Sequence, residues 1–497
     1  EKARRMAAQV PMRRMVAVAM LALLLLMLLS REKTSLRSPL PSLPLEWRVP
    51  VGCDYSGFFV EAVCGFIPAL LDAGLEVTLL TGECDANFLA NSLLPHEAAA
   101  YKQAWVKEND RDAAITSKSV VIEHGNPCLM RKWTQRPLWV IARAMSEGEL
   151  SRQEAACLGG SDEIWVPTSA HVSIFSRAGL DKRRLYAMPE IVDTSFFSPA
   201  QLSQSRESQV VGDDSCVPPP ARAPVPGPHG SVSTAPPPPH ACRAPFRFVS
   251  CFKFEFRKAP DLLLRAFWSE FSANDNVELL LKTYIPPWET HPPIQEWLRK
   301  VAASEFRRRS PDDLPRVIVR EDPISRTEMR EMYASSDAFV LPTRGEGWGL
   351  PIVEAMAMAL PVVVTNVTGP REYLTMENSY PVQIEGTYPE GLAKPSLASL
   401  RAQMRSVYSD RVRAKKRGRR AREDMLALYS PERVASLVVA RLRKIERKIE
   451  RKIRWEEYKA ARTHTSDTRL TAAQADSRRP GSTSSRSAHA NLDDDSL

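Results

Sequence analysis

The chain lacks the patterns that identify zinc-binding and nucleic-acid-binding proteins. None of its 8 cysteines forms a CxxC pair, and none clusters with histidine at metal-ligand spacing. A structural zinc site is therefore not expected. No zinc-finger or RNP-type pattern is present, and no basic stripe with interleaved aromatic residues crosses the middle of the chain. The sequence does not predict a nucleic-acid partner.

Proline, in contrast, is abundant and unevenly spread. A length of 497 residues predicts two or three domains, and 43% hydrophobic with 26% charged residues is typical of globular proteins. However, 40 prolines are too many for a packed fold throughout. Residues 201–245 contain a run of prolines and few large aliphatic side chains, so we expect a disordered insertion. The tail 461–497 is rich in Ser, Thr, Asp and Arg, and we expect it to be disordered too.

The N-terminus has the pattern of a membrane-targeting segment. Arginines precede an uninterrupted apolar run from Met15 to Leu29, and charged residues follow it. The run is shorter than the roughly 20 residues that span a bilayer, so a cleaved signal peptide and a short signal-anchor both remain open. The preceding positive charge and the missing small-x-small cleavage pattern favour an uncleaved anchor. This predicts a single-pass type II protein of the Golgi or ER membrane with a lumenal catalytic domain; a secreted or organellar location is the alternative.

Short apolar runs alternate with helix-like stretches in two series, one before residue 200 and one after residue 245. Runs such as "EIWVP" and "PVVVTN" are typical of strands covered on both faces, which occur in parallel sheets. We therefore predict two α/β domains. The predicted organisation is a signal-anchor at 1–34, a stem at 35–47, a first domain at 48–200, an insertion at 201–245, a second domain at 246–410, basic helices at 411–460 and a disordered tail at 461–497.

The stretch "RGEGWGLPIVEAMAMALP", residues 344–361, predicts a strand-turn-helix corner that can bind an anion. Pro351 suits the first turn of a helix, and the free N–H groups before it can hold a phosphate. Glu354 lies in that turn, where it could accept from ribose hydroxyls, and Glu346 follows the strand, where ligands bind in open α/β sheets. In the alternative interpretation, Glu354 only complements the helix dipole.

A second cluster lies in "SCFKFEFRKAPDLLLRAF", where Lys253 and Lys258 leave a strand and enter a helix. Two cations beside a helix N-terminus suit a diphosphate. Exposed lysines are also common at strand ends, and this alternative remains open.

Together these motifs resemble a known family. "EGWGLPIVEAMAMALPVVVTNVTGPREYL" resembles the E-x7-E signature of the retaining, family-4-type group 1 glycosyltransferases of the GT-B fold. "FKFEFRKAPDLLLRAF" is similar to their phosphate-binding strand and loop, and "DEIWVPTSAHVSIFSRAGL" resembles the last segment of their first domain. The resemblance implies an α/β GT-B architecture, in which two Rossmann-like domains with parallel sheets face each other across a cleft.

The resemblance also implies roles for residues of the second domain. Glu346 corresponds to the glutamate beside the donor sugar and reaction centre, and Glu354 to the glutamate that binds ribose. Lys253 and Lys258 correspond to an Arg-x4-Lys pair that neutralises the diphosphate, although lysine replaces the usual arginine at 253. The backbone that meets sugar or phosphate is that of Trp348, Gly349 and Leu350.

In the first domain the resemblance is looser. "GCDYSGFFVEA" stands where the family has a glycine-rich loop that faces the donor, which implicates Ser56 and Gly57. "VIEHGNP" puts His124 at a strand end, where some members have an active-site histidine. Ile191 replaces the usual glycine of the hinge pattern P-x-G-x-D.

The implied activity is retaining, hexosyltransferase-type transfer from a nucleotide-diphosphate sugar to a glycan, glycoprotein or lipid-linked acceptor. No metal or other cofactor is expected, because the Asp-x-Asp candidates at 110–112 and 493–495 lie in poor contexts for the metal-dependent transferases. Two alternatives stay open: a catalytically inactive GT-B scaffold that binds nucleotide or glycan at the membrane, and a nucleotide-sugar epimerase.

Overall fold

The computed structural model describes residues 40–50, 53, 57–107, 117–130, 133, 136–199, 244–310 and 313–476. The predicted signal-anchor, nearly all of the insertion 201–245, residue Ser56 and the end of the tail lie outside these residues. Within the part of the chain that is described, none of the helices has the length and apolarity that a membrane crossing requires. The structure forms two compact units, residues up to Leu442 and residues from Arg443 onward.

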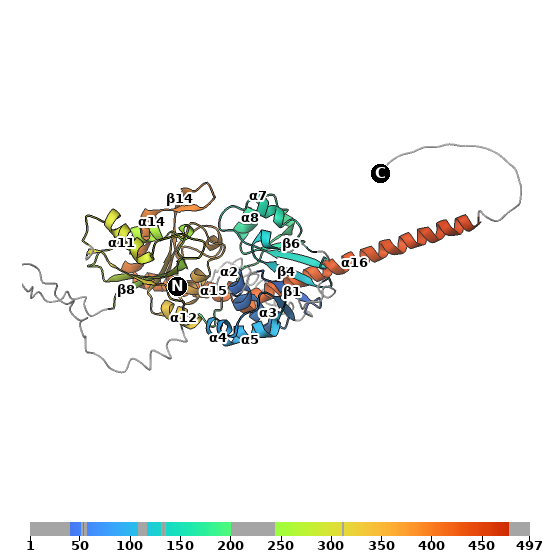
Figure 1. Cartoon of the computed structure of the whole chain (residues 1–497), viewed down its shortest axis with the longest axis horizontal. Helices are drawn as coiled ribbons and strands as arrows, with labels where there is room; N and C mark the ends of the chain where they lie inside the picture. The colour runs from blue at the N-terminus through green and yellow to red at the C-terminus, as the bar shows by residue number, and fades with distance from the viewer. Residues whose placement is uncertain are drawn as a thin grey trace, which may run out of the picture. The chain divides into compact units, whose positions relative to one another are not determined.

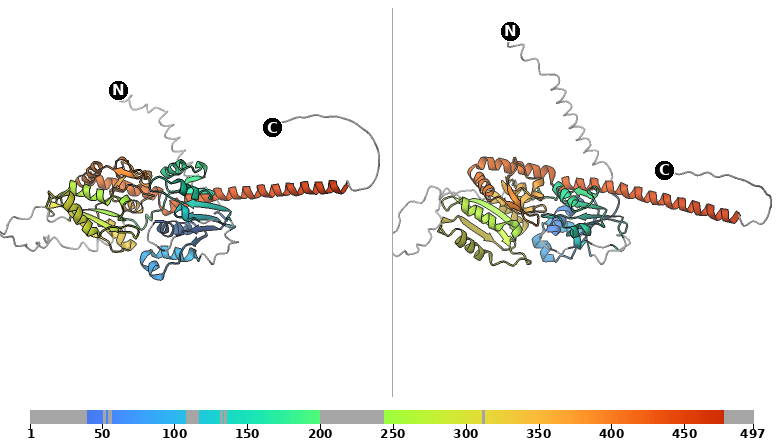
Figure 2. Two further views of the ribbon diagram at one scale, coloured as in Figure 1. Left: turned by 45° about the horizontal axis from the view of Figure 1, so that its top comes forward. Right: turned by 90° about the horizontal axis from the view of Figure 1, so that it is seen from above.

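The first unit contains two separate parallel sheets, as the sequence predicts (Figures 1 and 2). The first sheet has the strand order β3-β2-β1-β4-β5-β6-β7, and every neighbouring pair in it is parallel. Its strands are β1 (Leu45–Arg48), β2 (Val77–Leu80), β3 (Trp105–Val106), β4 (Val120–His124), β5 (Trp139–Arg143), β6 (Glu163–Val166) and β7 (Leu185–Ala187). Its main helical segments are α2 (Gly57–Val60), the π-helical η1 (Glu61–Phe66), α3 (Ile67–Asp72), α4 (Ala86–Ser92), α5 (Pro95–Ala104), α7 (Arg152–Cys157) and α8 (Ser169–Arg177).

The second sheet has the order β10-β9-β8-β11-β12-β13 and is also parallel throughout. Its strands are β8 (Phe246–Lys253), β9 (Val277–Tyr284), β10 (Arg316–Arg320), β11 (Ala338–Leu341), β12 (Val362–Thr365) and β13 (Tyr380–Val382), with a separate antiparallel hairpin of β14 (Ile384–Thr387) and β15 (Ala393–Pro395). Its main helical segments are η5 (Phe256–Lys258), α10 (Pro260–Glu270), α11 (Ile294–Glu305), α12 (Arg326–Ala334), α13 (Leu350–Ala357), η7 (Gly369–Glu372), α14 (Leu397–Ser409) and α15 (Arg411–Leu428).

The predicted stem 35–47 is wrong at its end, because Leu45–Arg48 forms strand β1 of the first sheet. β1 pairs with β2 on one side and β4 on the other, and Trp47 is fully buried against the ring of Phe66 at 4.9 Å. Pro44 immediately precedes the strand, a position that proline tolerates because it donates no hydrogen bond there. The first domain therefore begins before residue 48.

The basic helices predicted at 411–460 form as α15 and α16, and the structure adds that one face of α15 belongs to the core of the second domain. Ala414, Ala421 and Met425 of α15 are buried in that core, and Gly418 packs on the backbone of Ala359. Small residues at helical spacing let α15 lie close to α13, while most of its arginines and lysines point outward. Because most residues of this segment are basic, its few small, buried residues are not apparent from composition.

Helix α16 (Pro431–Asp476) continues past residue 461, where the sequence analysis placed a disordered tail. The regularly spaced Ile445, Ile449 and Ile453 lie before residue 461, so they account only for the earlier part of this helix. In the second unit, the exposed rings of Trp455 and Tyr458 stack at 5.6 Å between centroids.

Two disulfides form in the first domain, although the sequence did not give their connectivity. Cys53 pairs with Cys84, and Cys128 pairs with Cys157. Among the described residues, Cys64 and Cys251 are free.

Candidate functional site

The site lies at the carboxyl ends of β8 and β11, where the order of the second sheet changes direction and where open α/β sheets bind ligands. The loop after β11 carries Glu346, and η5 after β8 carries Arg257 and Lys258. Parallel neighbours bring these two loops to the same edge.

Glu346 and Lys258 form a close ion pair. The Lys258 ammonium donates to both Glu346 oxygens, at 2.6 and 2.8 Å. Arg257 Nη1 lies 3.4 Å from Glu346 Oε2 and donates to the Gly345 carbonyl at 2.9 Å. The loop of Glu346 is fixed by its own N–H, which donates to Thr368 Oγ1 at 2.9 Å. The structure therefore brings two predicted residues together and adds a second cation.

Burial disfavours the charged forms of both Glu346 and Lys258. Burial raises the pKa of Glu346, but the charges of Lys258 and Arg257 outweigh it, so the pKa lies below its ordinary value. Burial lowers the pKa of Lys258, and Glu346 opposes that shift. Buried charges of this kind are retained only where they are paired. Arg257 is also paired with Glu255, at 2.6 Å from its Oε1, so the two cations of this group share two carboxylates.

Glu354 lies one turn into α13 and accepts a hydrogen bond from Tyr333 Oη at 3.0 Å. Burial raises the pKa of Glu354, while Arg326 and the hydrogen bond from Tyr333 oppose the shift. Arg326 in turn pairs with Glu97 of α5 at 3.3 Å, and both side chains are buried. This buried ion pair joins the second domain to the first.

The turn before α13 is buried, and no side chain caps the helix that follows it. Gly349 has φ +93°, and a Cβ there would lie 2.7 Å from Ile352 Cδ1, so glycine is required. Leu350 is the first helical residue and Pro351 follows it. The Trp348 side chain, 1% exposed, packs in the core against Tyr373 and Tyr429. The Trp348 carbonyl accepts a hydrogen bond from Tyr373 Oη at 2.6 Å, so the predicted contact of this backbone with sugar or phosphate stays a prediction.

Lys253 lies at the end of β8, with its ammonium 4.9 Å from the ring centroid of Trp288. The Trp288 ring is 64% exposed. The structure thus gives Lys253 an aromatic neighbour and does not place it in the Glu346–Lys258 ion pair. Its role as a second diphosphate cation stays a prediction.

In the first domain, Gly57 begins α2 with φ +53° and is exposed, and the neighbouring Ser56 lies outside the described residues. His124 ends β4 as expected, but it is fully buried. Trp47 Nε1 donates to His124 Nδ1 at 3.3 Å, and His124 Nε2 lies 3.1 Å from Glu61 Oε2. His124 does not line the cavity between the domains.

Glu61, His124 and Glu190 place their donor atoms within 4.8 Å of one another, a spacing that a metal ion could use. Arg143, however, forms a buried ion pair with Glu190 and also donates to the Met188 carbonyl at 3.0 Å. Burial lowers the pKa of His124 to about 3 and raises those of Glu61 and Glu190 to about 7. The cation of this cluster is the Arg143 guanidinium.

The two domains of the first unit enclose a small cavity beside Glu354. Its wall includes Glu61 and Cys64 from η1, and Arg326, Leu350 and Glu354 from the second domain. A Cβ at Gly347 would lie 2.2 Å from Met145 Sδ, so the loop after β5 reaches the loop that carries Glu346. The carboxylate of Glu372 accepts from Ser169 N at 3.0 Å, which joins η7 to the start of α8.

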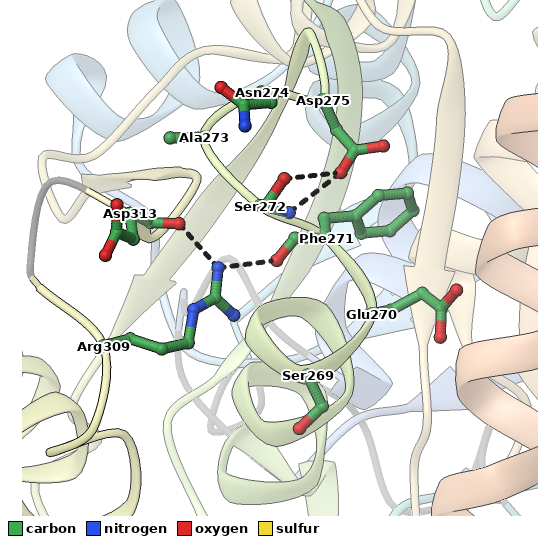
Figure 3. A pocket seen from close by; sticks show the side chains of 9 residues that line it. All are labelled: Ser269, Glu270, Phe271, Ser272, Ala273, Asn274, Asp275, Arg309 and Asp313. Atoms are coloured by element: carbon green, nitrogen blue, oxygen red, sulfur yellow. Dashed lines mark hydrogen bonds between the residues drawn. The ribbon is translucent and has the colours of Figure 1, made fainter.

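A larger hollow of about 460 Å³ lies elsewhere, on the loop between α10 and β9 (Figure 3). Arg309 there donates to the carbonyls of Phe271 and Asp313, and Asp275 accepts from Ser272. This loop precedes β9, so the hollow is at the opposite end of the sheet from Glu346. The hollow contains none of the predicted site residues.

Sequence comparison identifies the part of the chain that carries this site. Residues 246–400 match the family described as "Glycosyl transferases group 1". These residues form a group 1 glycosyltransferase domain. Glycogen synthases from two strains of Mycobacterium tuberculosis are 31% identical over 113 residues, which is 23% of this chain and 25% of those proteins. The chain thus matches about a quarter of the length of these curated relatives.

Solved structures share the fold over most of the chain. HepE of Anabaena in complex with UDP and glucose has a TM-score of 0.53 at 11% identity, covering 80% of this chain and 99% of that one. A glycosyltransferase of Rickettsia africae has a TM-score of 0.54 at 12% identity, covering 81% of this chain and 99% of that one. A sucrose-phosphate synthase of Thermosynechococcus elongatus has a TM-score of 0.53 at 16% identity, with the same coverage of 81% and 99%. At such identities the likeness concerns the fold alone, which is GT-B: the group 1 domain and a second Rossmann-like domain.

Sequence reasoning missed two residues that the structure places around the group 1 site, Arg257 and Glu61. Arg257 was hidden by its neighbour Lys258, which fits the family spacing. Glu61 was available as a signal, because it is the one charged residue in the apolar stretch "GFFVEAVCGFIPALL". When a helix must be buried, a single acidic side chain in it indicates that a specific polar or charged partner holds that side chain.

Proposed function

We propose that this protein is a glycosyltransferase that moves a sugar from a nucleotide-diphosphate sugar to a glycan, glycoprotein or lipid-linked acceptor. The observation that carries the proposal is the group formed by Glu346, Lys258 and Arg257 beside the N-terminus of α13. A leaving diphosphate gains negative charge as the sugar departs, and fixed cations and N–H groups stabilise that charge. The UDP and glucose bound by HepE and the names of the glycogen synthases support this substrate class.

In this proposal each residue has a separate task. Lys258 and Arg257 neutralise the diphosphate, helped by the N–H groups at Gly349 and Leu350. Glu354 accepts from the ribose hydroxyls, and Tyr333 orients it at 3.0 Å. Glu346 holds Lys258 in place and faces the sugar. Retention of anomeric configuration and independence of metal are part of the proposal and rest on the resemblance to family-4-type enzymes.

We also propose that the protein is a single-pass type II protein whose catalytic domain lies in the lumen of the ER or Golgi. The apolar run from Met15 to Leu29 supports this, with basic residues before it. The disulfides Cys53–Cys84 and Cys128–Cys157 add independent support, because disulfides persist in oxidising compartments.

The test is a donor panel with the full chain. UDP-, GDP- and ADP-sugars are first screened by thermal shift, since a ligand that binds the folded state raises its apparent stability. The best donor is then assayed for hydrolysis and for transfer to maltotriose and to octyl glucoside. We expect Glu346→Gln to reduce transfer by roughly 100-fold or more while nucleotide binding persists, as for loss of a group that stabilises the transition state. Nucleotide binding without transfer or hydrolysis by the wild type would instead support the inactive scaffold, and a changed free nucleotide-sugar would support an epimerase.

A further inference from the structure

In the second unit, helix α16 separates its charges onto different faces. Figures 1 and 2 show α16 as one unbroken helix. Between Arg443 and Arg462 it has nine basic and four acidic residues. At about 100° per residue, seven of the basic side chains project within an arc of about 140°. These seven are Lys444, Arg447, Lys448, Arg451, Arg454, Lys459 and Arg462. We call this arc the basic face.

The acidic residues of this stretch lie outside the basic face. By the same geometry, Glu446, Glu450, Glu456 and Glu457 project from the rest of the circumference. The basic face therefore brings like charges together at i, i+4 spacing, such as Arg447 and Arg451, and such pairs destabilise an isolated helix. Solvation alone gives no reason for this arrangement, whereas an anionic ligand would relieve the repulsion.

Two aromatic rings lie within the basic face. Trp455 and Tyr458 stack at 5.6 Å between centroids and are 54% and 50% exposed. Lys459 Nζ, which also pairs with Glu456 at 3.2 Å, lies 5.4 Å from the Trp455 ring centroid. The Arg462 guanidinium lies 5.7 Å from the Tyr458 ring centroid, and its Nη1 donates to Tyr458 Oη at 3.3 Å. The rings and their cations are thus held together on the helix surface before any ligand binds.

We propose that the basic face of α16 binds an anionic polysaccharide, a sugar chain that carries carboxylate or sulfate groups. Lysine and arginine bind such anions through charge-assisted hydrogen bonds. The apolar C–H face of a sugar ring packs on an exposed aromatic ring, a contact that a polyanion without rings cannot make. From Lys444 to Arg462 the face extends over about 27 Å at 1.5 Å per residue, which suits a chain and not a single sugar.

An anionic membrane is the other surface that a basic helix could meet. A helix that lies in a membrane interface inserts an apolar face, with its cations on the opposite side. In α16 the isoleucines opposite the basic face include Ile445 and Ile449, and both are already buried. Anionic lipids also concentrate in the cytoplasmic leaflet, whereas the location proposed above is lumenal. The choice of a glycan over a lipid rests on that proposed location.

The experiment measures binding of the full chain to immobilised heparin and to immobilised polygalacturonate by surface plasmon resonance. We expect binding to at least one of them, weakened by added NaCl because salt screens exposed charges. The triple variant Arg447→Ala, Arg451→Ala and Arg454→Ala should lower the affinity by roughly 3- to 100-fold, the effect of losing three exposed ion pairs. Trp455→Ala should lower it by roughly 2- to 10-fold and leave binding of inorganic polyphosphate unchanged.

The matched control is the triple variant Lys300→Ala, Arg307→Ala and Arg308→Ala, which removes the same charge from exposed positions in the second domain. It should bind like the wild type, and thermal unfolding is measured for every variant. Binding to neither glycan, equal losses in both triple variants, or tighter binding to phosphatidylserine vesicles or duplex DNA than to the glycans would overturn the inference. No sugar donor is present, so any of these results leaves the proposed function standing. A chain that binds the glycan and transfers no sugar would contradict the proposed function alone.

Discussion

At the scale of single residues, the two glutamates of the E-x7-E pattern have different surroundings, and this supports different tasks. Glu346 is held by Lys258 and Arg257, so its pKa is lowered. Glu354 is held by a neutral phenol, Tyr333, and burial raises its pKa. A carboxylate held between two cations suits the reaction centre, where negative charge develops on the leaving group. A carboxylate that accepts a hydrogen bond from a phenol suits the recognition of hydroxyl groups.

We predict that Glu354→Gln weakens nucleotide binding by roughly 10- to 100-fold, since a hydrogen bond to a charged group contributes about 1.5–3 kcal/mol. Titration calorimetry with the nucleotide diphosphate identified in the donor panel measures this. Glu377→Gln is the control, because Glu377 is exposed and outside the site. Equal affinities of Glu354→Gln and wild type would remove Glu354 from the ribose site.

At the scale of elements, the position of α13 depends on its first turn and on α15 behind it. Gly349 turns the chain with a positive φ before Leu350, and Gly418 of α15 lets the backbone of Ala359 approach. The helix N-terminus is thereby fixed at the sheet edge that carries Glu346.

We predict that Gly349→Ala destabilises the second domain by about 1–3 kcal/mol, the cost of holding a non-glycine residue at this φ, and lowers Tm by several degrees. Differential scanning calorimetry gives the shift. Gly386→Ala is the matched control, because Gly386 lacks a positive φ and a Cβ there meets nothing within 4 Å. A Gly349→Ala variant as stable as Gly386→Ala would show that the turn relaxes freely.

At the scale of the whole molecule, the first domain contains disulfide bonds, and among the described residues the second domain contains none. Cys53–Cys84 spans 31 residues and Cys128–Cys157 spans 29, and both bridges are in the first domain. The domains also contact each other through the buried pair Glu97–Arg326 and through Glu372 on Ser169. These contacts couple the stabilities of the two domains.

We predict that reduction lowers the stability of the first domain by about 2–5 kcal/mol per bridge and shifts its unfolding to a lower temperature than that of the second domain. Calorimetry with and without dithiothreitol would then resolve two transitions in the reduced protein. Cys251→Ser provides the control, since Cys251 is a free thiol in the second domain. An unchanged thermogram under full reduction would contradict this prediction and weaken the lumenal location.

The sequence by itself determined the two parallel sheets, because runs of buried β-branched residues alternate with helices, and the strand-turn-helix corner at Gly349 and Pro351, because these residues are local in the chain. The resemblance to a known family placed Glu346 and Lys258 in one site, but their ion pair is a finding of the structure. Only the tertiary structure decided that Leu45–Arg48 is a strand, that α15 belongs to the core, and that Glu61, not His124, reaches the cavity. These features depend on contacts between residues far apart in sequence, such as Trp47 with His124 and Gly418 with Ala359, and local patterns carry no record of such contacts.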